Sequence, residues 1–497
     1  MTEMDIIYRS TRNSAGGLKA SEAIIQGIST DGGLFVPDHF PKLDKSVSEL
    51  AKMDYKGVAY EVMKLFLTDF SEEELKYCID HAYDEKFDTE EIAPLSYVEN
   101  AYYLELFHGK TIAFKDMALS ILPYLMTTAA KKNHVEEKIV ILTATSGDTG
   151  KAALAGFADV EGCGIVVFYP KGGVSRVQER QMVTQKGANV KVVGITGNFD
   201  DAQTGVKQIF ADRELQAQMK ERGYRFSSAN SINIGRLIPQ VAYYVFAYTR
   251  LVKEGRISDG EKINFTVPTG NFGNILAGYY AKQIGIPVKN LICASNENKV
   301  LFDFFESGIY DRNREFILTS SPSMDILISS NLERLIYEIA GEDADACRDL
   351  MKSLSENGRY EITDAMKERL KGFIGGYASE EECAKRIHDV YADTGYVMDT
   401  HTAVASAVYD KYVKAANDTT PTVIVSTASP FKFTRSVMEA LEQKKEDADD
   451  FELIDRLSAM TGMNVPNAVE EIRNAEVLHD TVCDKEQMKD EVIKFLK

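Results

Sequence analysis

The chain has 497 residues, of which 44% are hydrophobic and 27% charged, a composition that excludes a fibrous or disordered protein. This length exceeds what one hydrophobic core usually supports, so we expect two or three domains. The 76 acidic and 57 basic side chains give a net charge of -19, which disfavours nucleic acid and anionic membrane as partners but leaves room for a local site that binds a small anion.

The N-terminal segment, residues 1–95, is rich in Glu, Lys, Leu and Tyr and has helical spacing after Val47. It also contains the turn-forming stretch Thr30-Asp31-Gly32-Gly33, a composition typical of tight turns. We expect this segment to form a separate N-terminal domain.

A catalytic domain is expected over residues 96–440. From residue 138, short β-branched runs alternate with longer amphipathic segments, which is typical of strands joined by crossover helices. We expect strands at residues 138–145, 164–169, 190–196, 263–269, 291–295 and 421–426. Several runs are apolar throughout, so the pattern predicts an α/β fold with open parallel sheets and helices on both faces.

Smaller units are predicted within and after this domain. We expect a small mobile subdomain at about residues 131–195. A polar helical pattern and a Gly375-Gly376 break indicate a helical insertion at about residues 300–395. Residues 441–497 are expected to form a helical C-terminal extension.

Ligands of open α/β sheets bind beyond the carboxyl ends of the strands, and one such junction is rich in glycine. The run consists of Gly270, Asn271, Phe272, Gly273 and Asn274. It follows a predicted strand and precedes an amphipathic segment, so its backbone N–H groups could hold a phosphate at a helix N-terminus. A tight turn without a ligand is the alternative.

A second junction, Ser146-Gly147-Asp148-Thr149-Gly150, resembles part of a nucleotide-binding loop. Lys151 is followed by Ala152, which has no hydroxyl for magnesium, and Thr145 stands where the first glycine is required. Neither junction contains the GxGxxG pattern of dinucleotide-binding proteins. The sequence therefore disfavours nucleotide binding.

Lys115 is the candidate nucleophile. It lies among Ile112, Phe114 and Met117, where loss of solvent would lower the ammonium pKa and leave an amine free to form a Schiff base. A Lys-Asp dipeptide can also be a solvated helix face. The phosphate-binding pattern in the same chain favours the reactive lysine.

Together these motifs resemble threonine synthase, a pyridoxal-phosphate family of fold type II. The resemblance is carried by Phe114-Lys115-Asp116 after His108-Gly109, by both glycine-containing loops, by Thr427-Ala428-Ser429-Pro430, by Tyr8, Ser10-Thr11-Arg12 and residues 30–37, and by residues 228–233 before Arg236. It implies pyridoxal 5'-phosphate bound through Lys115, its phosphate on residues 270–274, and Thr427 at the pyridine nitrogen. Related enzymes have Asn where Asp148 stands, so the role of Asp148 is left open.

The resemblance also implies the reaction of O-phospho-L-homoserine with water, which gives L-threonine and phosphate. The substrate phosphate then needs a second site. The substrate-binding candidates are Ser146, Asp148, Thr149, Lys171, Ser175, Arg176, Asn233 and Arg236, with solvated surface as the alternative. His401 is interpreted as a capping or packed residue and receives no role.

Two other classes of function stay open. Another pyridoxal-phosphate lyase, such as a threonine or serine dehydratase or a cysteine synthase, would share Lys115 and the phosphate loop. A non-catalytic relative would only bind phosphorylated ligands.

The six cysteines are scattered without a CxxC pair, which favours a reducing compartment. No basic N-terminal region precedes an apolar stretch, and no 18 apolar residues are consecutive. We expect a cytoplasmic monomer or homodimer with a small-molecule substrate, no membrane association and no metal.

Overall fold

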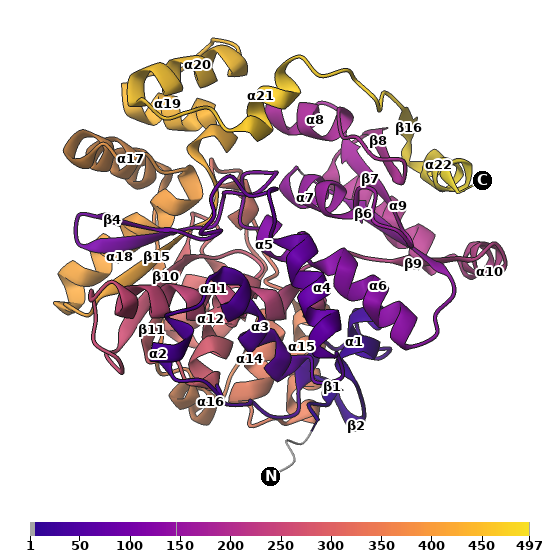
Figure 1. Ribbon diagram of the computed structural model, residues 1–497, viewed down its shortest axis with the longest axis horizontal. Helices are drawn as coiled ribbons and strands as arrows, with labels where there is room; N and C mark the ends of the chain where they lie inside the picture. The colour runs from indigo at the N-terminus through magenta and orange to yellow at the C-terminus, as the bar shows by residue number, and fades with distance from the viewer. Residues whose placement is uncertain (1–4, 146, 497) are drawn as a thin grey trace.

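The computed structural model describes residues 5–145 and 147–496, and two sheets organise it. One sheet has six strands in the order β14 (Phe373–Tyr377), β11 (Val288–Ser295), β10 (Ile263–Pro268), β15 (Thr422–Ser426), β5 (Ala101–Glu105) and β4 (Leu95–Val98). The other has five in the order β16 (Val482–Asp484), β8 (Val190–Thr196), β7 (Cys163–Pro170), β6 (Lys138–Ala144) and β9 (Tyr224–Ser227). They occupy the left and right parts of the molecule (Figure 1).

Every pairing in these two sheets is parallel except that of the edge strand β4 with β5. All six strands expected from the sequence are present, with ends that differ by up to three residues. The predicted α/β fold of parallel sheets is therefore confirmed.

Helices cover both faces of the six-stranded sheet. Val423 and Val425 pack in one hydrophobic cluster with residues of α11 and α12, whereas Ile424 between them packs in another cluster with residues of α18. These helices are α11 (Ile234–Lys253), α12 (Gly273–Ile284) and α18 (Thr400–Ala416). Burial on both faces explains the apolar runs in these strands.

The five-stranded sheet is covered in the same way. Ile139 and Ile141 face the cluster that contains residues of α6 and α7, whereas Val140 and Leu142 face the cluster that contains residues of α9, α10 and α22. These helices are α6 (Leu122–Lys132), α7 (Asp148–Phe157), α9 (Phe199–Ala211), α10 (Arg213–Glu221) and α22 (Met488–Phe495).

The N-terminal segment contributes a small antiparallel sheet and four helices. They are β1 (Tyr8–Ser10), β2 (Asn13–Leu18), β3 (Phe35–Pro37), α1 (Ala20–Gln26), α2 (Val47–Leu50), α3 (Tyr55–Phe66) and α4 (Glu72–Ala82). The Tyr55 ring contacts the Phe246 ring of α11 edge to face, with 5.3 Å between centroids. The segment thus shares a hydrophobic cluster with the six-stranded sheet.

The region between β11 and α18 contains helices and three strands. Its helical elements are α13 (Val300–Ser307), η1 (Pro322–Met324), α14 (Leu332–Ile339), α15 (Ala344–Asn357), α16 (Asp364–Arg369) and α17 (Glu380–Thr394). Strands β12 (Ile309–Asp311) and β13 (Arg359–Glu361) pair antiparallel, although η1, α14 and α15 lie between them in the sequence.

One prediction for this region is wrong: the Gly375-Gly376 pair is no break but lies inside β14, the edge strand of the large sheet. A Cβ on Gly376 would come within 2.4 Å of Val408 Cγ1, and one on Gly375 within 3.0 Å of Phe305 Cβ. The glycines let helices approach the strand closely.

The C-terminal segment connects the two sheets. After α19 (Thr434–Glu442) it forms α20 (Asp450–Thr461), α21 (Asn467–Arg473), β16, η3 (Lys485–Gln487) and α22. Strand β16 was not expected; Cys483 pairs with Ile195 of β8. Figure 1 shows the segment running from the helices of the large sheet to the far edge of the small one.

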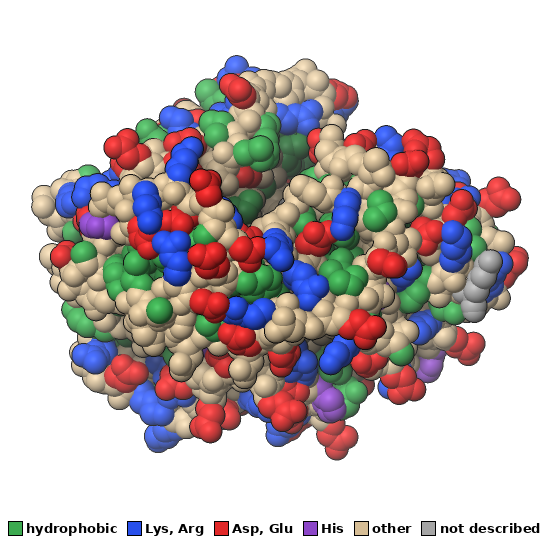
Figure 2. Space-filling model, turned by 90° about the horizontal axis from the view of Figure 1, so that it is seen from above, with side chains coloured by type: hydrophobic (Ala, Val, Ile, Leu, Met, Phe, Trp, Pro, Cys, Tyr) green, Lys and Arg blue, Asp and Glu red, His purple; other side chains and the backbone are tan. Residues whose placement is uncertain are grey.

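The upper face of the molecule is hollowed near its centre, and hydrophobic side chains line the hollow (Figure 2). Acidic and basic side chains are mixed over the surrounding face. Within the described residues, no helix is both long and apolar enough to span a membrane.

Candidate active site

The loop that joins β5 to α5 (Asp116–Leu119) carries Lys115. The backbone N–H and hydroxyl of Thr111 donate to the Asp116 carboxylate at 2.8 and 2.6 Å. The Phe114 N–H donates to the Thr427 carbonyl at 2.8 Å. Lys115 is therefore fixed beside the carboxyl end of β15, where ligands of such sheets bind.

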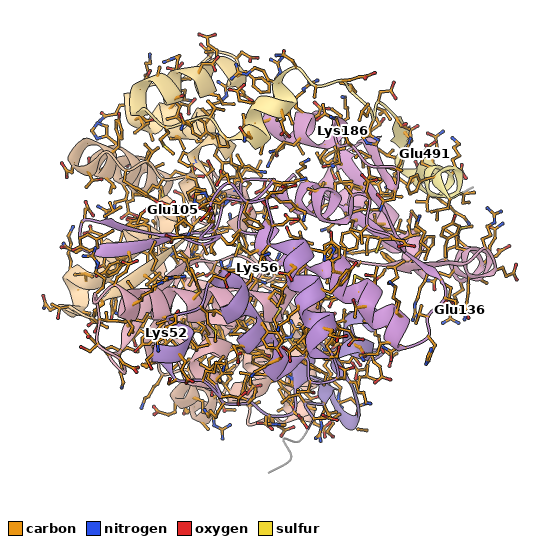
Figure 3. The ribbon with its side chains drawn as sticks, viewed as in Figure 1. Lys52, Lys56, Glu105, Glu136, Lys186 and Glu491 are labelled. Atoms are coloured by element: carbon orange, nitrogen blue, oxygen red, sulfur yellow. The ribbon has the colours of Figure 1, made fainter. Side chains whose placement is uncertain are left out.

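Glu105, at the carboxyl end of β5, marks the start of this loop (Figure 3). Its carboxylate accepts from the Ser96 and Tyr396 hydroxyls at 2.8 and 3.1 Å and lies 3.1 Å from His108 Nε2. These contacts hold the loop against β4 and the segment before α18.

The side chain of Lys115 is 12% exposed. Its Nζ donates to Ser323 Oγ at 2.9 Å and lies 3.6 Å from Asp148 Oδ2. Burial lowers the pKa of Lys115, and the charge of Asp148 opposes this only in part. The amine is consequently poised as a nucleophile.

The loop at residues 270–274 follows β10, the neighbour of β15. A Cβ on Gly270 would come within 2.5 Å of the Ser323 carbonyl, so only glycine fits here. Among the described residues, none accepts a hydrogen bond from the backbone N–H groups of Asn271 through Asn274. These donors, at the N-terminus of α12, form an anion site next to the residue that binds the Lys115 amine.

Asn274 is held in place from behind. Its Oδ1 accepts hydrogen bonds from the hydroxyls of Tyr243 and Tyr244, both at 2.7 Å. Its Nδ2 is buried and has no partner within the part of the chain that the structure describes. A buried donor left free in this way is costly unless a ligand accepts from it.

Thr427 lies directly after β15 and is buried. Its carbonyl accepts from the Phe114 N–H and so anchors the Lys115 loop. Lys115, Thr427 and the 270–274 loop therefore meet at the carboxyl ends of two adjacent strands.

Asp148, in the first turn of α7, is the carboxylate nearest to Lys115 among the described residues. Its Oδ1 accepts from Gln178 Nε2 at 3.0 Å and lies 3.2 Å from Lys432 Nζ. Its Oδ2 accepts from Ser323 Oγ at 3.2 Å. Burial alone would raise the pKa of Asp148, but the ammonium groups of Lys432 and Lys115 hold it well below its usual range.

His401 acts on the same serine. The Ser323 backbone N–H donates to His401 Nε2 at 3.1 Å, and His401 Nδ1 lies 2.8 Å from Asp399 Oδ2. Because Nε2 accepts, the ring proton is on Nδ1 and is donated to Asp399. The imidazole is buried and fixes the position of Ser323 beside Lys115.

Three family models match the chain. Residues 7–83 match the threonine synthase N terminus, residues 95–429 the pyridoxal-phosphate dependent enzymes, and residues 402–482 the C-terminal part of threonine synthase. The threonine synthase of Saccharomyces cerevisiae is 36% identical over 466 residues, which cover 88% of this chain and 89% of that protein. The chain belongs to the threonine synthase family.

Solved structures of this family have a similar fold. The crystal structure of the pyridoxal-phosphate-bound threonine synthase from Brucella melitensis has a TM-score of 0.88 and 34% identity, and the two chains are covered to 99% and 100%. The yeast threonine synthase structure has a TM-score of 0.89 and 32% identity, with 99% of each chain covered.

Threonine synthase-like proteins also match. Human threonine synthase-like 1 is 41% identical over 439 residues, which are 86% of this chain but 58% of that protein. The chain therefore spans less than two thirds of the length of these relatives.

Pyridoxal 5'-phosphate, the cofactor expected from the sequence, is confirmed by the family match and by the bound neighbour structure. The residues around Lys115 fit this cofactor. Lys115 provides an amine for the aldehyde, the N–H groups of residues 271–274 provide donors for the phosphate, and the hydroxyl of Thr427 provides a partner for the ring nitrogen.

Of the substrate-binding candidates, those of the loop after β7 lie on the surface. Lys171 pairs with Glu179 at 2.6 Å and Arg176 pairs with Asp449, and the two basic side chains are 53% and 61% exposed. Ser175 caps α8 (Arg176–Val183) by accepting from the Gln178 N–H at 3.2 Å.

The loop before α7 contributes two described candidates. Asp148 lies against Lys115, and the half-buried Thr149 follows it in the first turn of the helix. Ser146 lies outside the described residues.

Asn233 caps α11, and Arg236 lies in its first turn. Asn233 Oδ1 caps the helix by accepting from the Gly235 N–H at 2.8 Å. Arg236 is buried, donates to the Ala229 carbonyl at 3.0 Å, and its Nε has no partner within the described chain. Burial lowers the pKa of Arg236 to about 10, and its charge helps to lower that of Lys115.

Three residues that contact the site were missed or set aside in the sequence: Ser323, Lys432 and His401. Lys432 comes two residues after Pro430, the end of the motif that follows β15, so the rule of strand ends could have found it. Ser323 lies in a Ser-Pro-Ser turn inside the 300–395 region, and no charge or glycine marks it. His401 follows Asp399, the residue that caps α18.

Proposed function

We propose that the chain converts O-phospho-L-homoserine and water into L-threonine and phosphate. The observation that carries this proposal is the buried Lys115 amine together with two sets of anion donors that have no partner in the described chain, the N–H groups of residues 271–274 and Arg236 Nε. The loop can hold the cofactor phosphate. Arg236 then remains for the substrate's phosphate or carboxylate, which a guanidinium binds well.

Bound pyridoxal phosphate supplies an electron sink for charge that develops on the substrate carbon atoms. With the cofactor bound, the free Lys115 amine would remove protons from Cα and Cβ of the substrate as general base. The Cγ–O bond breaks and phosphate leaves. Lys115 then returns a proton to Cγ, water adds to Cβ with loss of a proton, and Cα is protonated last.

The other groups around Lys115 suit these transfers. Ser323 accepts a hydrogen bond from the amine, and His401 fixes the serine through its backbone. Because the Lys115 and His401 side chains are largely buried, the amine is shielded from bulk water during the early steps.

A product assay tests the function. The purified chain with pyridoxal phosphate is incubated with O-phospho-L-homoserine or with L-threonine, and inorganic phosphate and 2-keto acid are measured. Threonine and phosphate in equal amounts from the first substrate support the proposal. A 2-keto acid from threonine identifies a dehydratase, and no turnover of either substrate with cofactor attached to Lys115 identifies a binding protein.

The substrate-phosphate site gives a first prediction. Arg236→Ala should raise the KM for O-phospho-L-homoserine by about 10- to 100-fold, as expected for a lost charged hydrogen bond. Lys171→Ala should raise the KM less, because Lys171 is half exposed and already paired with Glu179. Absorbance of the bound cofactor should stay intact. An unchanged KM in either variant would remove that residue from the site.

We also propose that the protein acts in the cytoplasm as a monomer or homodimer on a small-molecule substrate. Free, buried cysteines support a reducing compartment.

A further inference from the structure

The carboxylate of Asp148 lies between the amino groups of two lysines. Oδ1 lies 3.2 Å from Lys432 Nζ, and Oδ2 lies 3.6 Å from Lys115 Nζ. Asp148 and Lys432 are both buried. The neutral Asn that relatives have here, in the resemblance drawn from the sequence, could not play this part.

Lys432 is matched to this place. Its side chain is fully buried, and its Nζ donates to the Thr111 carbonyl at 2.9 Å and to Gln181 Oε1 at 3.0 Å, with Asp148 as its third partner. Three partners satisfy the three N–H bonds of an ammonium group. Within the described residues, Asp148 is the one carboxylate within ion-pair distance of it.

Charge balance then bears on Lys115. Asp148 and Lys432 already form a neutral pair, so a proton on Lys115 would add an uncompensated charge to a buried site. If Lys432 were neutral, Asp148 would be free to hold that proton on Lys115. We propose that Lys432 is a positioning residue that keeps the Lys115 amine unprotonated by taking the Asp148 carboxylate as its own counter-ion.

The remaining groups around the lysine agree with this assignment. Arg236 adds a second buried positive charge, and His401 reaches the site as a neutral ring through Ser323. Burial lowers the pKa of Lys115 most, Asp148 opposes it, and Lys432 and Arg236 lower it further. The importance of this for turnover rests on the proposed function, but the protonation of Lys115 does not.

The test measures that protonation directly. The full chain, freed of cofactor by dialysis against hydroxylamine, is exposed briefly to cyanate, which carbamylates neutral amines. Modification of the Lys115 peptide is followed by mass spectrometry from about pH 6 to pH 10, a range that brackets a lowered lysine pKa. The variants are Lys432→Met, Asp148→Asn, their double mutant, and Lys151→Met as control, since Lys151 is also buried but bonds to Gln185.

Lys432→Met should move the midpoint of Lys115 labelling up by about one pH unit, and Asp148→Asn should move it down. The midpoint of Lys115 labelling in the neutral double mutant should lie between the midpoints of the two single variants. The double mutant also gives a comparison with the wild-type chain if a single variant fails to fold. Lys151→Met should leave the midpoint in place. A midpoint that is unchanged or lower in Lys432→Met, or equal shifts in Lys432→Met and Lys151→Met, would overturn the proposal, whatever the product assay shows.

Discussion

At the scale of single residues, hydrogen bonds between distant parts of the chain build the site. Ser323 accepts from Lys115, donates to Asp148 and is fixed by His401. These four residues belong to separate elements of the fold. None of them is therefore placed for chemistry until the chain has folded as a whole.

His108 fastens the start of the Lys115 loop. Its ring lies between two carboxylates, 2.6 Å from Asp88 and 3.1 Å from Glu105. Both ring nitrogens can donate when the imidazole is protonated, so the two contacts favour the charged form.

The pH dependence of stability should report these His108 contacts. Burial opposes the charge on His108, but Asp88 and Glu105 raise its pKa to about 9. A raised pKa stabilises the fold fully below the unfolded value of about 6.5, and this effect is lost as pH rises through the folded value. His108→Gln should therefore lower the free energy of unfolding at about pH 6 by on the order of 2 kcal/mol, given that Asp88 is half exposed, and by little at about pH 10.

Urea unfolding at both pH values measures this difference. His81→Gln is the control, because the His81 ring bonds to the Tyr77 carbonyl at 2.8 Å and to no carboxylate of the described chain. An equal loss of stability at the acidic and the alkaline pH would contradict the assignment.

At the scale of elements, close packing decides where glycine is needed. Strand β14 lies under α13 and α18, and its two glycines leave no room for a side chain. Gly376→Ala should destabilise the fold by about 1–3 kcal/mol, because the new Cβ would overlap Val408. Gly194→Ala in β8 is the matched control, since its Cβ would find its nearest atom at 3.4 Å. Thermal unfolding compares them, and equal melting temperatures would refute the packing argument.

The strands with both faces buried could be predicted because burial leaves continuous apolar runs such as Ile139 to Leu142. Strand β14 could not, since Gly375 and Gly376 signal a turn until the neighbouring helices are known. Strand β16 is three residues long, and its pairing with β8 depends on where the preceding chain places it. In the site, the strand-end rule pointed to the surroundings of Lys115, whereas Ser323 gains its contacts from tertiary structure alone.

At the scale of the whole molecule, the C-terminal segment ties the two sheets together. Arg180 of α8 donates to the carbonyls of Ile472 and Ala475 at 2.8 and 2.6 Å. Val477 and Leu478, which follow Ala475 in the chain, are nearly half exposed. The stretch between α21 and β16 is therefore held by hydrogen bonds rather than by deep burial, whereas Val469 of α21 and Val492 of α22, on either side of it, are fully buried.

Arg180→Gln should loosen this segment. We expect thermolysin to cleave near Leu478 about tenfold faster, because the lost hydrogen bonds lower the cost of local opening. Arg222→Gln, at an exposed position after α10, should leave the rate unchanged. Cleavage at the wild-type rate in Arg180→Gln would show that other contacts hold the segment.

The connection between Lys115 and Thr427 has a consequence for synthesis of the chain. The Phe114 N–H bonds to the Thr427 carbonyl, and β5 pairs with β15, although more than 300 residues separate them in sequence. A ribosome must therefore release the polypeptide through β15 before the cofactor can be captured. Until then the edge of β5 that β15 will cover depends on other contacts for protection, which makes the nascent protein prone to aggregate while the intervening residues are being translated.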